Sequence, residues 1–310
     1  MSNILIIKHG SLGDLIQANG AIEDIKNFYK KSNVVLLTSQ QYFDLMCKCP
    51  YVDEVIVDKR LPRWNLLYLR RLKKKLFSYN FTHVFDLQNS SRTKFYSKYI
   101  INLPKWSSTE TSLELGQTKS DFDKEPVLKR MEVQLKKSGI KINNVKRSNL
   151  NWAVSNIRHI TKDFIKKKYI LIFPFCSPKL VVKKWPFYSI LISHLKAKYG
   201  NKYDIVVAPG PTEVEESQLL NAQVILNKGK PLRINELISL IKDASFIIAN
   251  DTGPAHICSH MNKLGLVLFG SHTSAHKVSI ETEKFKPISV KDLNLLKTET
   301  VMEWIKNKLN

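Results

Sequence analysis

A polar segment late in the chain carries residue types that bind phosphate. Asn250-Asp251-Thr252-Gly253-Pro254-Ala255-His256 directly follows the apolar run 246–249. Glycine permits close backbone approach, and proline suits the first turn of a helix. Because free amides at a helix start attract anions, the segment predicts a phosphate site. It equally predicts an ordinary helix capped by Asp251 or Thr252, and the two interpretations are compatible.

A second candidate loop, Gly10-Ser11-Leu12-Gly13-Asp14, follows the apolar run 4–7. It lacks the G-x-G-x-x-G spacing of dinucleotide-binding proteins. Asp14 places a carboxylate at a helix start, where it would repel a pyrophosphate. Thr38 and Ser39 end the next run, where an NAD-binding protein has an acidic residue for the ribose. NAD binding is therefore excluded. Asp14 is either a charge that favours the helix N-terminus or a functional carboxylate.

Two further loops carry candidate charges. Lys183 lies in Lys183-Lys184-Trp185-Pro186, ahead of an expected helix. A lysine there either neutralises a diphosphate as a point charge or is simply solvated. Glu213 ends Gly210-Pro211-Thr212-Glu213 after an expected strand. Its carboxylate either accepts hydrogen bonds from a ribose or base, or lies in a surface turn.

Two histidine pairs have the spacing of helical metal ligands. His256 and His260 are four residues apart, as are His272 and His276, each pair on a possible helix. Neither pair has the glutamate of an H-E-x-x-H motif. No metal site is predicted.

The apolar pattern predicts the elements that position these loops. Apolar runs alternate with helical patterns, which indicates parallel, doubly wound α/β sheets. The expected strands are 4–7, 34–37, 55–57, 84–87, 169–173, 205–208, 246–249 and 266–269. The expected helices include 15–25, 66–76, 187–199, 234–242 and 255–261. The polar stretch 141–156 separates two Rossmann-like domains, expected at 1–158 and 159–310.

The charge points to an anionic partner. The chain has 310 residues with 49 Lys and Arg against 27 Asp and Glu, a net charge of +22. The excess is spread over both halves, so it is not a basic tail. Phosphorylated lipid, nucleic acid and a membrane surface are all suitable partners. Lysine accumulation in a sequence rich in Lys, Asn and Ile is the alternative explanation. No apolar run approaches the length that spans a bilayer, about 18 residues.

Taken in chain order, these loops resemble glycosyltransferase family 9, the ADP-heptose:lipopolysaccharide heptosyltransferases. The similarity runs from residue 4 to about residue 272, and the Asp-Thr-Gly-Pro segment with its histidine is the most specific part. The matching motifs are Ile4-Leu5-Ile6-Ile7-Lys8 with Gly10 to Asp14, Asp86-Leu87-Gln88-Asn89 with Arg92, Lys183 to Pro186, Gly210 to Glu213, and Asp251 to His256.

The resemblance implies a GT-B fold, in which two Rossmann-like domains face a central cleft. The N-terminal domain would bind the acceptor and the C-terminal domain the nucleotide sugar. It also implies inverting, metal-independent transfer without a cofactor. Asp14 would be the general base, and Lys183 would stabilise the departing diphosphate. The implied donor contacts are Glu213, Asp251, Thr252, Gly253 and His256, and the implied acceptor contacts are Ser11, Gly13, Gln88 and Arg92.

Three departures from the family pattern border the sugar and diphosphate positions. Gly20 replaces the usual proline, and Phe175-Cys176-Ser177-Pro178 replaces a glycine-containing loop. Gly270-Ser271-His272-Thr273 stands where glycine-proline-threonine is commoner. These changes leave the donor sugar open.

The densest charge lies in 59–75, with eight basic residues and no acidic one. Leucines at helical spacing predict that its later part is an amphipathic helix. This basic face is either solvated or functional. In the functional interpretation, Arg60 and Arg63 hold anionic groups of the acceptor through bidentate hydrogen bonds. The cluster 70–75 then faces an anionic membrane.

The sequence thus predicts a transferase that moves heptose from ADP-heptose to a lipopolysaccharide core acceptor of the lipid A–Kdo type. We expect it in the cytoplasm, peripherally attached at the inner face of the membrane, with no nucleic-acid partner. One alternative is a transferase of the same fold with another nucleotide sugar. The other is a non-catalytic, basic nucleic-acid-binding protein, although no recognition motif for that class is present.

Overall fold

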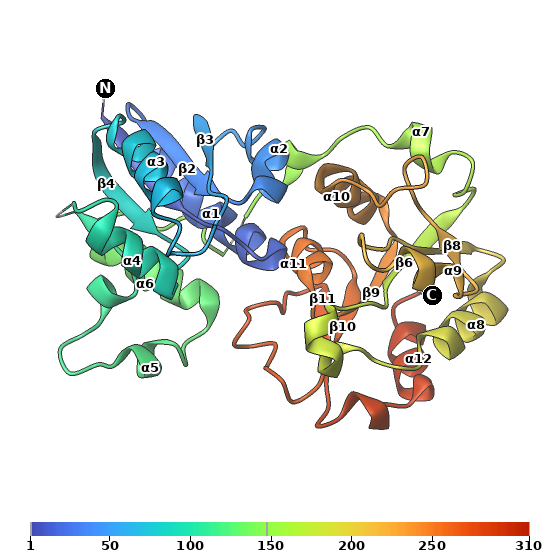
Figure 1. Cartoon of the computed structure of the whole chain (residues 1–310). Helices are drawn as coiled ribbons and strands as arrows, with labels where there is room; N and C mark the ends of the chain where they lie inside the picture. The colour runs from blue at the N-terminus through green and yellow to red at the C-terminus, as the bar shows by residue number, and fades with distance from the viewer. Residues whose placement is uncertain (1, 104, 147, 310) are drawn as a thin grey trace. The chain divides into compact units, whose positions relative to one another are not determined.

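The continuous apolar runs form the central strands of two parallel sheets, one in each half of the chain (Figure 1). The computed structural model describes residues 2–103, 105–146 and 148–309. The chain divides into an N-terminal unit, Met1–Trp152, and a C-terminal unit, Ala153–Asn310. This division precedes the expected boundary after residue 158. The expected pair of Rossmann-like α/β sheets is confirmed.

The N-terminal sheet has the strand order β3-β2-β1-β4-β5, and all its pairings are parallel. Residues 4–7 of β1 are completely buried, which explains their uninterrupted apolar character. The strands are β1 (Asn3–Ile7), β2 (Asn33–Thr38), β3 (Glu54–Val57), β4 (Phe81–Asp86) and β5 (Trp106–Ser107). The helices are α1 (Leu12–Phe28), α2 (Phe43–Met46), α3 (Leu66–Phe77), α4 (Ser91–Tyr99), α5 (Lys119–Phe122) and α6 (Val127–Lys137).

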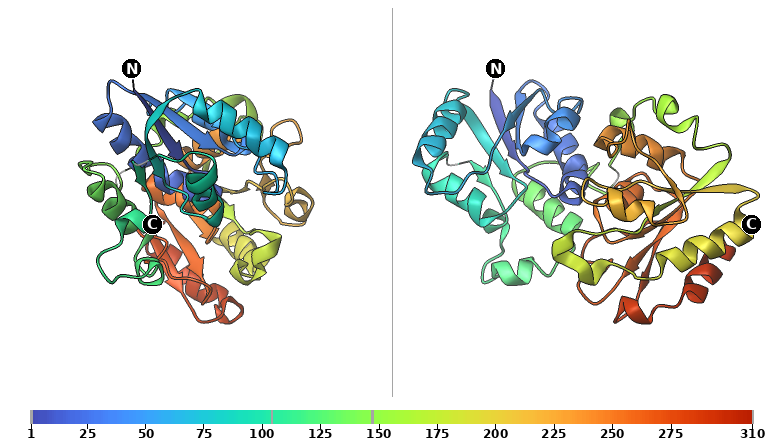
Figure 2. Two further views of the ribbon diagram at one scale, coloured as in Figure 1. Left: turned by 60° about the vertical axis from the view of Figure 1, so that its left-hand side comes forward. Right: turned by 45° about the vertical axis from the view of Figure 1, so that its right-hand side comes forward.

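The C-terminal sheet has the order β11-β10-β9-β6-β7-β8, again with parallel pairings. Near the chain end, α12 lies beside α8, as Figure 2 shows. The strands are β6 (Lys168–Phe173), β7 (Tyr203–Val207), β8 (Gln223–Val224), β9 (Phe246–Asn250), β10 (Gly265–Phe269) and β11 (Phe285–Ser289). The helices are α7 (Arg158–Thr161), α8 (Tyr188–Tyr199), α9 (Val214–Gln218), α10 (Ile234–Asp243), α11 (Gly253–His260) and α12 (Thr298–Lys306).

Each sheet reverses its strand order once, and ligands of such sheets bind beyond the carboxyl ends of the strands at that point. In the N-terminal unit, β1 lies between β2 and β4, so the reversal brings together the loops after β1 and β4. In the C-terminal unit, β6 lies between β7 and β9, which brings together the loops after β6 and β9. All four loops contain residues that the sequence marks as functional.

The polar stretch before the unit boundary packs on α1. The buried carboxylate of Asp24 accepts hydrogen bonds from the backbone amides of Asn143, Asn144 and Val145. A Cβ atom on Gly20 would lie 2.1 Å from the carbonyl oxygen of Asn144. Glycine at this departure from the family pattern therefore allows the stretch to approach the helix closely.

Across the described ranges of the chain, no helix is both long and apolar enough to cross a membrane.

Candidate functional sites at the two strand-order reversals

The start of α1 is neutralised by its own carboxylate. Ser11 is the N-cap, and its backbone amide and hydroxyl both donate to Asp14 Oδ2, at 2.9 and 3.1 Å. Ser11 is exposed and Asp14 half-buried, whereas Gly13 is buried. The structure therefore contains the helix-stabilising carboxylate, and the same group remains accessible as a proton acceptor.

Buried polar contacts fix the loop after β1 against the loop after β4. Gln88 Oε1 accepts hydrogen bonds from the amides of His9 and Gly10, at 2.9 and 3.2 Å. Lys8 Nζ donates to the carbonyl of Leu87 at 2.9 Å. Burial lowers the pKa of Lys8, and nearby Asp14 and Asp86 oppose that effect. Gln88, which is predicted to contact the acceptor, thus holds the backbone of the loop after β1 in place.

The predicted basic residues Arg60, Arg63 and Arg92 meet beside α4. Arg92 Nη2 donates to the carbonyls of Arg60 and Leu61, and Arg92 Nη1 to Tyr96 Oη at 2.9 Å. Arg63 Nη2 donates to Ser91 Oγ at 2.9 Å. Arg92 therefore shapes the loop that carries the other two arginines.

A cavity of about 440 Å³ opens beyond β4 and β5 in the same unit. Its lining contains six hydroxyl side chains, the indole of Trp106, two lysines, Lys94 and Lys119, and two carboxylates, Asp86 and Glu110. Lys94 pairs with Glu110 at 2.6 Å. Hydroxyls, an aromatic face and charged groups of both signs suit a sugar. The hydroxyl residues are Ser90, Ser91, Ser97, Ser108, Thr109 and Thr111. Most of this lining was not predictable from the sequence, because its residues come from loops and from α4 without a recognisable motif.

In the C-terminal unit, a buried carboxylate gathers the candidate groups. Asp251, whose side chain is 2% exposed, follows β9 and lies 2.6 Å (Oδ2) from Lys183 Nζ. The same oxygen lies 3.1 Å from His272 Nε2, and Oδ1 lies 3.8 Å from His256 Nε2. Lys183 ends the 3-10 segment Pro178–Lys183, and its side chain is 20% exposed. The structure thus brings together Lys183, Asp251 and His256, which are far apart in sequence.

Asn250 connects the two loops of this site. Its Nδ2 donates to the carbonyl of Pro174 at 2.9 Å, after β6. Its Oδ1 accepts from the backbone amide of Trp185 at 3.3 Å and from Tyr188 Oη at 3.1 Å. Trp185 is fully buried. The buried side-chain amide of Asn250 therefore holds the loop that carries Lys183 against the end of β9, which Asp251 follows.

The start of α11 differs from that of α1. In the fully described stretch 252–260, the N-cap Thr252 makes no side-chain capping bond and the first turn contains no acidic residue. Thr252 instead donates its hydroxyl to the carbonyl of Asn250. The first turn of any helix leaves amides without intrahelical partners, so this end can accept an anion.

Glu213 follows β7 and accepts a hydrogen bond from the Gly210 amide at 2.7 Å. Burial raises the pKa of Glu213, an effect that the Gly210 bond opposes. Glu213, Lys183 and Lys184 all lie close enough to Cys176 to influence the pKa of its thiol. Glu213 is therefore near the Lys183 loop.

Only one of the two histidine pairs lies on a helix. His256 and His260 lie on α11 as expected, but the expectation of a helix around His272 and His276 is wrong, because those residues lie in turns. His272 instead stacks on Phe269 and contacts Asp251. Its place beside Asp251 depends on the turn after β10, so residue spacing could not reveal it. Within the described part of the chain, no His, Cys, Asp and Glu side chains are grouped to hold a metal ion.

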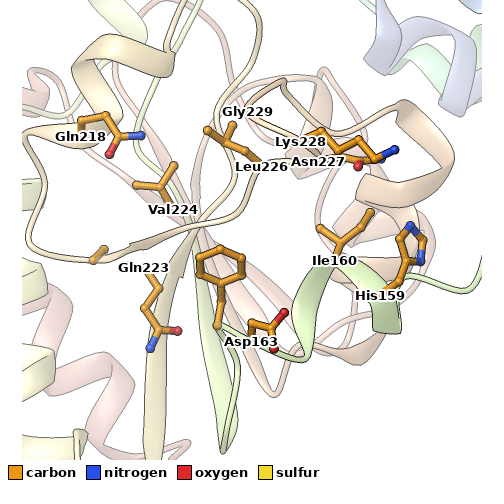
Figure 3. A pocket seen from close by; sticks show the side chains of 12 residues that line it. His159, Ile160, Asp163, Gln218, Gln223, Val224, Leu226, Asn227, Lys228 and Gly229 are labelled. Carbon is orange, nitrogen blue, oxygen red and sulfur yellow. The ribbon is translucent and has the colours of Figure 1, made fainter.

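Another cavity, of about 640 Å³, lies in the C-terminal unit beside the edge strand β8 (Figure 3). Its lining includes His159, Asp163 and Lys228 and contains none of the predicted donor residues.

Comparison with known proteins decides which family these loops define. Residues 69–302 match glycosyltransferase family 9 (heptosyltransferase), which covers most of the chain. The chain belongs to glycosyltransferase family 9. It is an enzyme of glycosyl transfer, similar to heptosyltransferases.

Relatives and solved structures agree with the family. Lipopolysaccharide heptosyltransferase 1 of Campylobacter coli is 22% identical, over 89% of this chain and 87% of the relative. ADP-heptose lipopolysaccharide heptosyltransferase II of E. coli aligns over 100% of this chain and 98% of its own, with TM-score 0.74 and 16% identity. E. coli heptosyltransferase WaaC, solved with ADP-2-deoxy-2-fluoro heptose, aligns over 98% and 99%, with TM-score 0.71 and 14% identity. The two-sheet architecture is thus of the GT-B type.

Proposed function

We propose that this chain is an inverting, metal-independent transferase that moves heptose from ADP-heptose to the lipopolysaccharide core. The observation that carries the donor side is the start of α11, whose first turn holds no acidic residue, next to the Lys183–Asp251 pair. A dipole end and a lysine form a site for a diphosphate, which leaves with increased negative charge during transfer. The solved structure of WaaC with an ADP-heptose analogue supports the choice of donor.

The proposed reaction is a single displacement at the anomeric carbon. The acceptor hydroxyl oxygen forms a bond to that carbon as the bond to the β-phosphate oxygen breaks. Asp14 takes the hydroxyl proton, and the electron pair of the broken bond stays on the diphosphate. Lys183 and the amides around Thr252 and Gly253 stabilise that charge. Attack opposite to the leaving group inverts the configuration of the sugar.

Asp251 holds Lys183 in this scheme, and Glu213 and His256 contact the nucleotide sugar. The carboxylate of Glu213 is suited to accept hydrogen bonds from ribose hydroxyls. Asp251 is too deeply buried for broad contact with a ligand. Its contribution is to orient the lysine and the two imidazoles around it.

The acceptor is proposed to bind the N-terminal unit. Ser11 and Gly13 place Asp14, and Gln88 fixes the same loop. Arg60 and Arg63 would hold anionic groups of the acceptor, on a loop that Arg92 shapes. The hydroxyl-rich cavity beside α4 supports binding of a core sugar. We place the enzyme at the inner face of the cytoplasmic membrane, where a lipid-linked acceptor would be reached.

Calorimetry with ADP, UDP, GDP, NAD and single-stranded RNA tests the proposed donor class. We expect ADP to bind most tightly. Purified enzyme should then transfer heptose from ADP-heptose to a core acceptor, with the mass increase of the product measured by mass spectrometry. Tighter binding of UDP or GDP, with transfer of another sugar, would identify the same-fold alternative. Binding of RNA alone would contradict the function.

A further inference from the structure

The loop between β3 and α3 and the first turn of α3 expose large apolar side chains to solvent. Trp64 is 79% exposed and Leu66 is 73% exposed. Four such residues lie within 61–67, and we call them the apolar tip: Leu61, Trp64, Leu66 and Leu67. Single exposed leucines are normal on a protein surface, and Leu115, Leu219 and Leu295 are examples here. A cluster that includes tryptophan instead indicates an interaction surface.

The backbone beneath the apolar tip is held firmly in place. Asp58 is buried and accepts hydrogen bonds from the Arg60 amide and from Tyr96 Oη, both at 2.8 Å, and from Tyr68 Oη. Burial alone would raise the pKa of Asp58. Hydrogen bonds from His9 and Tyr68 outweigh that effect and lower the pKa to about 2, so the carboxylate is charged at neutral pH.

A second anchor completes the support. Arg92 binds the carbonyls of residues 60 and 61, and Asn65 caps α3 by accepting from the Tyr68 amide at 3.0 Å. Polar groups thus fix both ends of the loop, while its apolar side chains stay in water. The exposure is therefore built into the fold.

The charge around the apolar tip identifies its partner. Residues 59–75 hold eight basic side chains and no acidic one, and the basic side chains of α3 are exposed. Tryptophan and leucine beside arginine and lysine are typical of segments that lie in the headgroup region of a bilayer. An acidic protein surface would satisfy the charges and leave the apolar side chains in water.

We propose that the apolar tip inserts into the interfacial region of an anionic lipid bilayer, while the basic side chains of 59–75 bind the headgroups. This inference rests on the proposed function, because it assumes a lipid-linked acceptor. The tip is close to the cavity assigned to that acceptor, since Arg63 bonds to Ser91 and Ser91 lines the cavity. Insertion would present the cavity to sugars at the membrane surface.

Vesicle sedimentation with the full chain tests this surface. We expect binding to vesicles that contain phosphatidylglycerol and little binding to phosphatidylcholine alone. A variant with Trp64→Ser, Leu66→Ser and Leu67→Ser should lose at least about tenfold in affinity, which corresponds to about 1.4 kcal/mol. The matched control carries Leu219→Ser and Leu295→Ser, which remove exposed leucines from the C-terminal unit and should leave binding unchanged.

Tryptophan fluorescence separates insertion from purely electrostatic attachment. Vesicles should shift the emission of the wild-type protein to shorter wavelength. Trp64→Phe should keep most of the binding and lose most of that shift. If the triple-serine variant binds like wild type, or if no shift occurs on binding, the apolar tip does not insert. If the same variant loses binding to single-stranded RNA and not to lipid, the partner is nucleic acid.

Transfer to a delipidated acceptor distinguishes failure of this inference from failure of the proposed function. The triple-serine variant should keep wild-type turnover on that acceptor, because its changed side chains are exposed and are not among the residues proposed to bind donor or acceptor. Turnover without any vesicle binding would overturn the inference alone. Vesicle binding without transfer from any nucleotide sugar would overturn the proposed function alone.

Discussion

The two strand-order reversals place the same kinds of groups differently. At each, a helix begins near a lysine and a carboxylate. In α1, Asp14 occupies the helix start and binds the Ser11 amide, while Lys8 is buried and bound to a carbonyl. In α11, the first turn has no carboxylate, and Asp251 lies just before it, paired with Lys183.

In the proposed function, this difference divides one reaction between two similar folds. A carboxylate at the start of α1 repels phosphate and can accept a proton. A helix start without a carboxylate in its first turn, beside a partly exposed lysine, attracts phosphate. The units are related in architecture, and the position of a single carboxylate relative to each helix would separate their proposed roles.

The largest expected effect is that of Asp14→Asn. The change preserves volume and removes the proton acceptor, so the transfer rate should fall by about 10²–10⁴. ADP affinity and thermal stability should stay close to wild type. Asp44→Asn is the matched control, because Asp44 lies in the first turn of α2. More than a tenth of the wild-type rate in Asp14→Asn would show that Asp14 only caps α1.

Lys183→Ala should weaken ADP binding by about ten- to a hundredfold, the range for a hydrogen bond to a charged group. Adenosine, which lacks phosphates, should bind as before. Lys184→Ala removes the neighbouring lysine, which pairs with Glu216, and should change ADP affinity much less. Calorimetry measures ADP binding by both variants and adenosine binding by Lys183→Ala. Equal losses for ADP and adenosine would place Lys183 away from the diphosphate.

Asp251→Asn tests whether the buried carboxylate orients Lys183. The free energy of unfolding should fall by about 1–3 kcal/mol, because Lys183, His256 and His272 lose a charged partner. ADP affinity should fall less than in Lys183→Ala. Thermal unfolding and calorimetry give both values, with exposed Asp163→Asn as the control. Tighter ADP binding in Asp251→Asn would mean that Asp251 competes with phosphate.

The smallest expected effect is that of chelation. Since Lys183 and the start of α11 are proposed to neutralise the diphosphate, excess EDTA should leave the transfer rate unchanged. A rate measurement with and without EDTA is sufficient. Complete loss of activity, restored by a divalent ion, would assign that role to a metal.

The central strands were predictable because they are buried on both faces and read as unbroken apolar runs. Each predicted strand overlaps an observed one. The short edge strands β5 and β8 were missed, since two residues give no period. Helices α4 and α6 were also missed. In α4 the buried side chains are Thr93 and Tyr96, which do not mark an apolar face. In α6, buried Leu128, Met131 and Leu135 do follow a helical period, so this helix could have been predicted.

The sequence predicts which loops carry the candidate site residues, but it does not predict how those loops are arranged in space. The meeting of Lys183 with Asp251 depends on β6 pairing with β9, and sequence spacing carries no information on that order. His272 joins Asp251 only through the turn after β10. The roles assigned to Asp14, Lys183 and the donor and acceptor residues stay predictions until the variants are measured.

The buried amide of Asn250 has a consequence for motion. Because one side chain bonds to Pro174, Trp185 and Tyr188, the loop after β6 and the end of β9 cannot fluctuate independently. Lys183 lies two residues before Trp185. Its backbone should therefore be about as immobile as that of the sheet, even though it is on a surface loop. Hydrogen exchange at the Trp185 amide should be nearly as slow as in β9. The ammonium group of Lys183 would then already be in position when a donor binds, and the enzyme would lose little conformational entropy on binding.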